Sequence, residues 1–470
     1  MKFVDEIRSA LGPAGTLMPV DAAAYLTDVR DTYSGQALLV ARPASTSEVA
    51  TVVRICRRHE VSIVPQGGNT GLCGGAIPGG TGSTVVLSLS RMNRIVALDA
   101  LRYTVTAEAG CILDPIHEAA SQADRLLSLD WGARGSATVG GAVSTNAGGI
   151  NVLRYGTTRD QVLGLEVVLA DGRIWNGLRS LRKNTAGFDI KQVFVGAEGT
   201  LGIVTQAVLK LHAKPAHEQS MFAALGDINR LAELFALVRS VAEGELSAFE
   251  LVCGFLMEKA LATQSALTRP VQTRSDWYVL VRLAGSKAIA EKLEEIYTTA
   301  AEAAILTDGT LAHTIAQERA LWSIREEMIP FKYMKGKMLK WDVSVAIDQI
   351  VPFLSAVNQF VDTLQQGATV IAFGHVGDGN LHMTIWPVGD PATQEFQVLC
   401  ERIVEATDRI AWTFGGSICA EHGVGVENVT RLQNQVSAIE LELMVRLKRT
   451  FDPGNLMNPG KVLRSDSDLP

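Results

Sequence analysis

The chain has 470 residues, of which 47% are hydrophobic and 20% are charged, and its formal net charge is −7. A chain of this length is expected to fold as two or three domains, each with its own hydrophobic core. The acidic balance argues against general binding of nucleic acid, which needs a basic surface.

The six cysteines form no CxxC pair and suggest no disulfide framework, so a reducing compartment is the simpler interpretation. The N-terminal sequence lacks the basic and apolar regions of a signal peptide. No apolar run reaches the roughly 18–20 residues that span a membrane. We therefore expect a cytoplasmic protein without a transmembrane segment, and leave peripheral attachment to a membrane open.

The first half of the chain alternates strands, short helices and glycine-rich loops. Ser45 and Glu48 fit a capping box in front of a helix over residues 45–61. Strands are expected around residues 61–66, 83–99 and 103–113, and an Asp-Gly turn joins two further strands over 164–175. This pattern ends with a strand that runs to about Leu211.

The sequence pattern changes after about residue 213, from glycine-rich loops and strands to amphipathic helices. Residues 228–244 and 287–304 have the periodicity of amphipathic helices, and strand-like segments such as 277–285 and 369–376 alternate with them. A helix from residue 438 is stopped by Asp452-Pro453-Gly454 and followed by an irregular tail. We predict an α+β fold with one domain over residues 1–213, a second with an antiparallel sheet and covering helices over 214–423, and a C-terminal helix and tail over 424–470 that return to the first.

Three glycine-rich stretches lie in the first half, at residues 65–75, 132–149 and 194–211, each beside a predicted strand. Backbone N–H groups approach a phosphate closely only where no Cβ intervenes. The first stretch matches neither G-x-G-x-x-G nor G-x-x-x-x-G-K-[ST], which disfavours a Rossmann dinucleotide site and a P-loop enzyme. One such loop could serve tight turns alone, but three favour a large bound cofactor.

This half resembles the FAD-binding domain of the vanillyl-alcohol oxidase type flavoproteins. The resemblance rests on PQGGNTGLCGG at 65–75, GGAVSTNAGGINVLRYG at 140–156, VLGLEVVLADG at 162–172 and GAEGTLGIVT at 196–205. It implies a two-part domain in which the first loop holds the FAD pyrophosphate, the second lines the isoalloxazine and ribityl groups, and the third contacts the adenosine end. The first loop has no histidine, so non-covalent FAD is implied; attachment through Cys73 is the less favoured alternative. The implied contacts are Pro65, Gly67, Gly68, Asn69, Thr70 and Gly71 in the first loop, Ser136, Thr138, Gly141, Ser144, Asn146 and Gly148 in the second, and Glu198, Gly199, Gly202 and Ile203 in the third.

A candidate metal site lies in the second half. His375 and His382 flank Asp378-Gly379, a strong hairpin turn signal, so that they can converge across the turn. Glu421 and His422 follow another strand-like piece. Two histidines and one carboxylate form a three-ligand set with an open position, as in catalytic zinc sites, although each histidine taken alone would more often be a packing or surface residue. Asp378 is interpreted as a turn residue or as a partner of a histidine N–H.

The patterns GHVGDGNLH at 374–382 and AEHGVG at 420–425 resemble the C-terminal domain of the FAD-linked D-lactate, glycolate and D-2-hydroxyglutarate dehydrogenases. The resemblance implies Zn²⁺ or another divalent metal on His375, His382 and Glu421. It places Asn380 and His422 at the substrate, Arg325 and Lys340 on the substrate carboxylates, and Asn458 at the flavin; the role of Lys461 stays open. The D-2-hydroxyglutarate branch usually has threonine four residues after the arginine, where this chain has Ile329, which favours a shorter or more apolar 2-hydroxy acid.

The sequence therefore predicts an FAD-dependent dehydrogenase, similar to the D-2-hydroxyglutarate dehydrogenases, that converts a D-2-hydroxy acid to the 2-oxo acid. We expect hydride transfer to flavin N5, metal-assisted loss of the hydroxyl proton, and His422 as the general base. The electron acceptor is expected to be an electron-transfer flavoprotein, a cytochrome or a quinone, and a homodimer is left open. The alternatives are a D-lactate or glycolate dehydrogenase or oxidase, and a non-catalytic flavin electron-transfer subunit.

Overall fold

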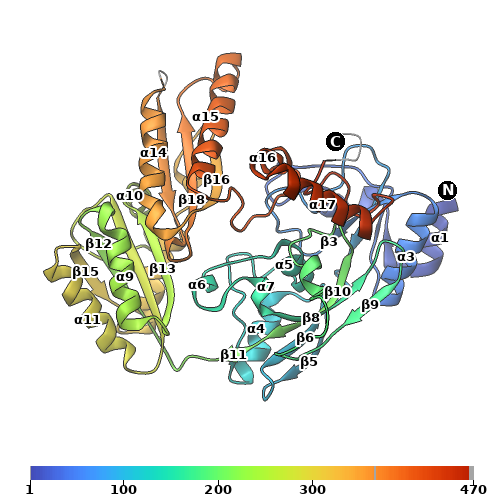
Figure 1. The fold of residues 1–470 in the computed structure, drawn as a ribbon, viewed down its shortest axis with the longest axis horizontal. Helices are drawn as coiled ribbons and strands as arrows, with labels where there is room; N and C mark the ends of the chain where they lie inside the picture. The colour runs from blue at the N-terminus through green and yellow to red at the C-terminus, as the bar shows by residue number, and fades with distance from the viewer. Residues whose placement is uncertain (1, 365–366, 465–470) are drawn as a thin grey trace. The chain divides into compact units, whose positions relative to one another are not determined.

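The computed structural model describes residues 2–364 and 367–464. The chain folds into two compact units (Figure 1). Unit 1 comprises Met1–Gly149, Tyr155–Lys214 and Glu421–Pro470, and unit 2 comprises Ile150–Arg154 and Pro215–Ala420. Helices and sheets occur in both, as the α+β prediction requires. Within the described part of the chain, no helix has the length and apolar character needed to cross a membrane.

Unit 1 contains two larger sheets that share one hydrophobic core, and a small two-stranded sheet of β7 (Arg125–Leu126) and β11 (His212–Ala213). The first has the order β1 (Thr16–Leu17), β2 (Leu39–Ala41), β4 (Thr84–Ser88), β3 (Ser62–Gln66), with β2, β4 and β3 parallel. The second is antiparallel, in the order β5 (Ile95–Asp99), β6 (Thr104–Glu108), β10 (Ile203–Lys210), β8 (Val162–Val168), β9 (Ile174–Gly177). The helices of this unit include α1 (Lys2–Leu11), α3 (Thr46–Arg58), α4 (Leu113–Gln122), α5 (Val139–Thr145) and the C-terminal α16 (Val429–Gln435) and α17 (Ala438–Phe451).

The start of α3 shows how the sequence specifies a helix end in this unit. The Ser45 hydroxyl accepts a hydrogen bond from the Glu48 backbone N–H at 3.2 Å, as the predicted capping box requires. The Glu48 carboxylate turns instead to the backbone N–H of Ala44, at 2.8 Å. The helix is therefore capped at the predicted residue, with its second capping bond displaced by one position.

Unit 2 is built on a four-stranded antiparallel sheet that is buried on both faces. Its order is β13 (Leu246–Cys253), β14 (Trp277–Gly285), β12 (His217–Leu225), β15 (Leu306–Leu311). Alternate residues of β12 enter different cores: Met221 and Ala223 pack with α9 (Leu231–Ala242) and α11 (Ile289–Glu302), while Phe222 and Ala224 pack with α10 (Gly254–Thr263) and α12 (Ile315–Glu326). The near-continuous apolar sequence of these strands follows from this double burial.

A second, three-stranded sheet in unit 2 has the order β16 (Leu339–Ser344), β18 (Asn380–Pro387), β17 (Ala368–Phe373). Helices α14 (Ile350–Asp362) and α15 (Gln394–Thr413) stand beside it (Figure 1). Leu339, Trp341 and Val343 of β16 enter the core with these helices. The intervening residues of β16 therefore lie on the opposite face of the sheet.

One short segment departs from the order of the chain in these two units. Residues 150–154, inside the predicted first domain, group with unit 2. Arg282 of β14 donates from Nη2 to the Asn151 Oδ1 at 3.2 Å, and Arg154 donates to the backbone carbonyl of Ala284. A glycine-rich motif that reads as one continuous loop therefore sends five residues into the other unit.

Candidate active site

One face of the small sheet of unit 2 packs into an apolar core, and the other, called the polar face below, carries a group of polar side chains beside Ile371 and Phe373. On the polar face, Lys340 and Asp342 of β16 alternate with buried apolar neighbours, and Asn380 and His382 of β18 do the same. The antiparallel register sets Asp342 directly opposite His382. Because the alternate residues fill the core, the strand pairing itself brings these polar side chains onto one surface.

The hairpin predicted at Asp378-Gly379 is confirmed. Strands β17 and β18 pair antiparallel around a short helical turn, η5 (Val376–Asp378), and Gly379 has a φ of 86°, which favours glycine. The ring centroids of His375 and His382 lie 5.4 Å apart and the rings are nearly perpendicular. The two histidines therefore converge across the turn, as their spacing indicated.

The chain that follows α15 runs along β16 and leads directly to Glu421 and His422. Cys419 forms a parallel bridge with Asp342, and the Ala420 backbone N–H donates to the Asp342 carbonyl at 2.9 Å. Glu421 and His422 come directly after. One potential ligand atom from each of His375, His382 and Glu421 lies within 4.8 Å of the others, and the same holds for Asp342, His382 and His422. Two nitrogen donors and a carboxylate at this spacing suit zinc.

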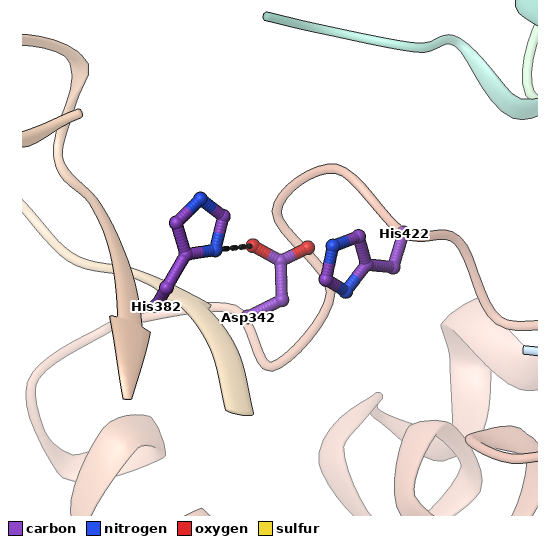
Figure 2. A group of neighbouring side chains, drawn as sticks. All are labelled: Asp342, His382 and His422. Carbon is purple, nitrogen blue, oxygen red and sulfur yellow. Dashed lines mark ion pairs between the residues drawn. The ribbon is translucent and has the colours of Figure 1, made fainter. Parts of the chain in front are cut away.

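Asp342 was not among the predicted site residues. Its buried carboxylate accepts a hydrogen bond from the Asn380 side-chain amide at 2.8 Å and lies 3.7 Å from His382 Nδ1. Figure 2 shows this carboxylate between the rings of His382 and His422. The sequence did hold a signal for it, because Asp342 lies two residues after Lys340 and so shares its strand face.

Glu250, on β13, is a second residue that the sequence analysis missed. Its side chain is 1% exposed, and its two oxygens face His375 Nδ1 at 2.8 Å and Arg325 Nε at 2.6 Å. Burial would raise the pKa of this carboxyl, but His375 and Arg325 outweigh it and lower the pKa to about 2. Glu250 therefore joins a predicted metal ligand to a predicted substrate residue.

The other predicted substrate residues occupy different environments. Lys340 is exposed on β16, opposite Thr384. Asn380 is 4% exposed, and its Oδ1 has no hydrogen-bond partner among the described residues. Ile329 is half-buried at the start of α13 (Pro330–Tyr333), directly after the helix that carries Arg325.

In unit 1, the first two predicted flavin loops are in close backbone contact. A Cβ at Gly68 would lie 1.9 Å from the Ser136 carbonyl oxygen, and one at Gly67 would lie 2.2 Å from the Thr138 hydroxyl. Gly71, by contrast, borders open space. The first two glycines are thus required by the approach of one loop to the other, and the third leaves room for a ligand.

Polar side chains of the first two loops also hold the surrounding backbone. Asn69, with a φ of 53°, donates to the carbonyls of Ala24 and Thr27, at 3.2 and 2.9 Å. Thr138 caps α5, accepting from the Gly141 N–H at 3.4 Å, and Asn146 ends this helix in the left-handed region. These contacts fix loop shape; the remaining predicted residues of these loops, Pro65, Thr70, Ser144 and Gly148, lie in the same two segments.

The third loop is tied to the second loop and to the C-terminal segment. The Glu198 backbone N–H donates to the Ser144 carbonyl at 2.7 Å, and its carboxylate accepts from the N–H groups of Val424 and Gly425 at 2.7 and 2.8 Å. Burial raises the pKa of Glu198, although these two hydrogen bonds act to lower it. Gly199 has a φ of 71°, a Cβ at Gly202 would press on Val167, and the Ile203 side chain is 1% exposed in the core. This loop therefore offers a ligand its backbone more than its side chains.

The C-terminal tail closes the same region. The Asn458 amide donates to the carbonyls of Gly75 and Glu198 at 2.9 and 2.8 Å, and the Lys461 ammonium donates to those of Gly74 and Ile77 at 3.0 and 2.9 Å. Asn458 Oδ1 is buried without a hydrogen-bond partner among the described residues. A buried acceptor that the protein leaves unsatisfied, beside glycine loops open to a ligand, fits a polar cofactor such as FAD.

Comparison with known proteins assigns the chain to a family. The model of the FAD binding domain matches residues 37–177, and that of the FAD linked oxidases, C-terminal domain, matches residues 214–462. The chain belongs to the FAD-linked oxidases. It is thus an oxidoreductase of the predicted class, with an FAD-binding fold in its first half.

Similar proteins cover most of the chain. D-2-hydroxyglutarate dehydrogenase, mitochondrial, of Danio rerio is 36% identical over 92% of this chain and 79% of its own length. D-2-hydroxyglutarate dehydrogenase of Xanthomonas citri pv. viticola is 35% identical over 95% and 93%. Among solved structures, p-cresol methylhydroxylase superposes with a TM-score of 0.76 at 16% identity, over 99% of this chain and 97% of the other. This last likeness shows the fold alone and confirms the predicted flavoprotein architecture.

We expect Lys461→Met to remove a pH-dependent part of the stability. Burial lowers the pKa of Lys461 to about 8, although the nearby Glu198 carboxylate acts against this shift. The pKa of a lysine in an unfolded chain is about 10.4. Between these values the unfolded chain holds more protons, so this group makes the free energy of unfolding rise with pH. Denaturant unfolding from about pH 7 to about pH 10.5 should show a steeper rise in the unmodified protein than in the variant.

The matched control is Lys183→Met, which removes one positive charge from an exposed loop of the same unit. Profiles for the unmodified protein and Lys461→Met that stay parallel across this pH range would show that Lys461 does not titrate inside the fold.

Proposed function

We propose that this protein oxidises a D-2-hydroxy acid to the corresponding 2-oxo acid, with FAD as the electron acceptor and a divalent metal ion at the substrate. The observation that carries the proposal is the convergence of His375, His382 and Glu421 on the polar face of the small sheet. Arg325, through Glu250, is tied to the first of these. A metal site and a cation for a carboxylate in one place match the two functional groups of a hydroxy acid.

The metal fits the residues present. His375, His382 and Glu421 are its proposed ligands, and zinc is the proposed ion because two imidazoles and a carboxylate leave one position open to substrate. A metal bound there would lower the pKa of the substrate hydroxyl, as zinc does for bound water. The Glu250 carboxylate accepts a hydrogen bond from His375 Nδ1, and the Asp342 carboxylate lies 3.7 Å from His382 Nδ1, so Nε2 is the proposed ligand atom of both rings.

His422 is the proposed general base. It receives the hydroxyl proton, while the C2 hydrogen leaves as hydride with the electron pair of the broken C–H bond and the 2-oxo acid is released. Bound FAD supplies the acceptor for that hydride. Asp342 lies beside the His422 ring (Figure 2), where a carboxylate stabilises the imidazolium that proton transfer creates.

The remaining roles concern binding. Arg325 and Lys340 are proposed to hold the carboxylates of the substrate, Arg325 through the two terminal nitrogens that Glu250 does not engage. Asn380 is proposed to use its unsatisfied Oδ1 at the substrate. The three glycine loops and Asn458 are proposed to bind FAD without a covalent bond, as the sequence analysis assigned. We also retain as proposals the domain limits at residues 213 and 423 and an electron-transfer flavoprotein, cytochrome or quinone as the final acceptor.

Two kinds of candidate substrate remain, a dicarboxylate and a shorter hydroxy acid, and a specific observation favours each. The names of the relatives favour D-2-hydroxyglutarate. Ile329 favours a shorter or more apolar acid, because an isoleucine offers no hydrogen bond to a second carboxylate. We propose D-2-hydroxyglutarate as the first candidate and D-lactate or glycolate as the second.

The decisive experiment mixes the anaerobic protein with single D- and L-2-hydroxy acids and follows bleaching of the flavin absorbance. We expect bleaching by D-2-hydroxy acids only, and loss of this reaction after treatment with the chelator dipicolinate while FAD stays bound. Added Zn²⁺ should restore it. A flavin that no hydroxy acid reduces would leave a non-catalytic electron-transfer subunit, and indifference to chelation would remove the metal from the reaction.

We expect His422→Ala to keep its FAD and its metal but to lower kcat by about 10²- to 10⁴-fold, the usual contribution of a general base. The measurement is steady-state turnover with an artificial acceptor, with flavin and metal content determined on the same sample. His217→Ala, which removes an exposed histidine from β12, is the control. Turnover within a few-fold of the unmodified protein would contradict the assignment of His422.

We expect Ile329→Thr to shift specificity toward the dicarboxylate. The ratio of kcat/KM for D-2-hydroxyglutarate to that for D-2-hydroxybutyrate should rise by about 10-fold, as one added hydrogen bond of about 1.4 kcal/mol would give. Ile315→Thr, at an exposed position on α12, is the matched control. An unchanged ratio would place Ile329 away from the substrate.

A further inference from the structure

Glu250 is a buried carboxylate whose position in the sheet requires an explanation. It lies on β13, between Phe249 and Leu251 of one core, and its side chain is 1% exposed. Burying a carboxylate lowers the stability of the fold by roughly several kcal/mol unless the carboxylate is paired and hydrogen-bonded. Each of its two oxygens has one cationic or hydrogen-donating partner, so the carboxylate is satisfied from two directions.

The first partner is His375. The Nδ1 atom of His375 lies 2.8 Å from Glu250 Oε1, so the ring donates its Nδ1 proton to the carboxylate. The backbone supports this contact, because Leu251 and Gly374, the neighbours of the two residues, exchange hydrogen bonds of 2.9 and 3.1 Å. Because Glu250 engages Nδ1, Nε2 is the ring atom that the proposed metal would use.

The second partner is Arg325. Its Nε donates to Glu250 Oε2 at 2.6 Å, and its guanidinium carbon lies 5.2 Å from the centre of the Phe373 ring. Its side chain is 11% exposed. Among the described residues, the two terminal nitrogens make no hydrogen bond, so the fork that suits a carboxylate is held in place with its outer edge unused.

We propose that Glu250 is a positioning residue that sets the metal ligand His375 and the substrate-binding Arg325 relative to one another. The proposal rests on the proposed function. One rigid carboxylate fixes the distance between the ion that would take the hydroxyl end of a 2-hydroxy acid and the cation that would take a carboxylate. Moving either partner disturbs the other, so metal binding and substrate binding depend on the same residue.

The test is Glu250→Gln, which keeps the size of the side chain but removes the charge. We expect metal affinity, measured by titrating the metal-free protein with Zn²⁺, to fall by about 10- to 100-fold, as for other residues that orient metal-bound histidines. The KM for the D-2-hydroxy acid should rise, and FAD content, held by unit 1, should not change. Glu258→Gln is the matched control, because Glu258 also pairs with an arginine of unit 2, Arg269, at 2.7 Å.

A second variant covers the case in which Glu250→Gln does not fold because Arg325 is left as a buried, unpaired cation. The double variant Glu250→Gln/Arg325→Met removes that cation and should still bind Zn²⁺ more weakly than the single variant Arg325→Met. Arg325→Met does not touch the proposed ion, and the proposal predicts that it too weakens Zn²⁺ binding, because Glu250 is then held from one side only.

The outcomes separate the two proposals. If the unmodified protein binds Zn²⁺ and turns over, while both glutamine variants match their parents in Zn²⁺ affinity, the positioning role of Glu250 is wrong and the proposed function stands. If the unmodified protein binds no Zn²⁺ at all, the metal part of the proposed function is wrong, and the positioning role is overturned with it.

Discussion

The arrangement of the candidate active site depends on the alternation of side chains along β16 and β18. Each strand buries every second residue against α14 and α15, and a shift of one residue in either strand would exchange the two faces. The core therefore specifies the register, and the register places Asp342 opposite His382. Polar residues that would be costly inside the core are thereby kept on the opposite face of the sheet, where the substrate site is proposed.

Local signals were enough to predict the parts of the site that neighbouring residues determine. The hairpin around Asp378-Gly379 follows from a turn that needs a positive φ at glycine, and it explains why His375 and His382 converge. The hairpin is short-range, so the sequence carries it directly. The glycines of the first loop were also visible in the sequence, but the partners that require Gly67 and Gly68, Thr138 and Ser136, lie far along the chain and only the structure shows them.

Glu250 and Asp342 could not be predicted in the same way. Glu250 is the one charged residue of β13, and its partners are 75 and 125 positions away in the chain. Nothing in the local sequence separates a carboxylate that pairs at such distances from one at a strand edge in solvent. Asp342 was easier to predict as a site residue, because it shares a strand face with Lys340. Only the pairing of β16 with β18 shows that it lies opposite His382.

The C-terminal tail adds a consequence for the order in which the protein is made. Met457 forms a parallel bridge with Ile63 of β3. The Ile63 N–H donates to the Leu456 carbonyl and the Asn458 N–H donates to the Ile63 carbonyl, at 2.7 Å each. These residues are translated only after the whole of unit 2. While the ribosome is still producing unit 2, the edge of β3 is therefore uncovered and the flavin loops lack the amide of Asn458 and the ammonium of Lys461. Unit 1 can complete its fold, and present a finished cofactor site, only late in synthesis, so the chain spends most of its translation with one exposed strand edge open to pairing with other nascent chains.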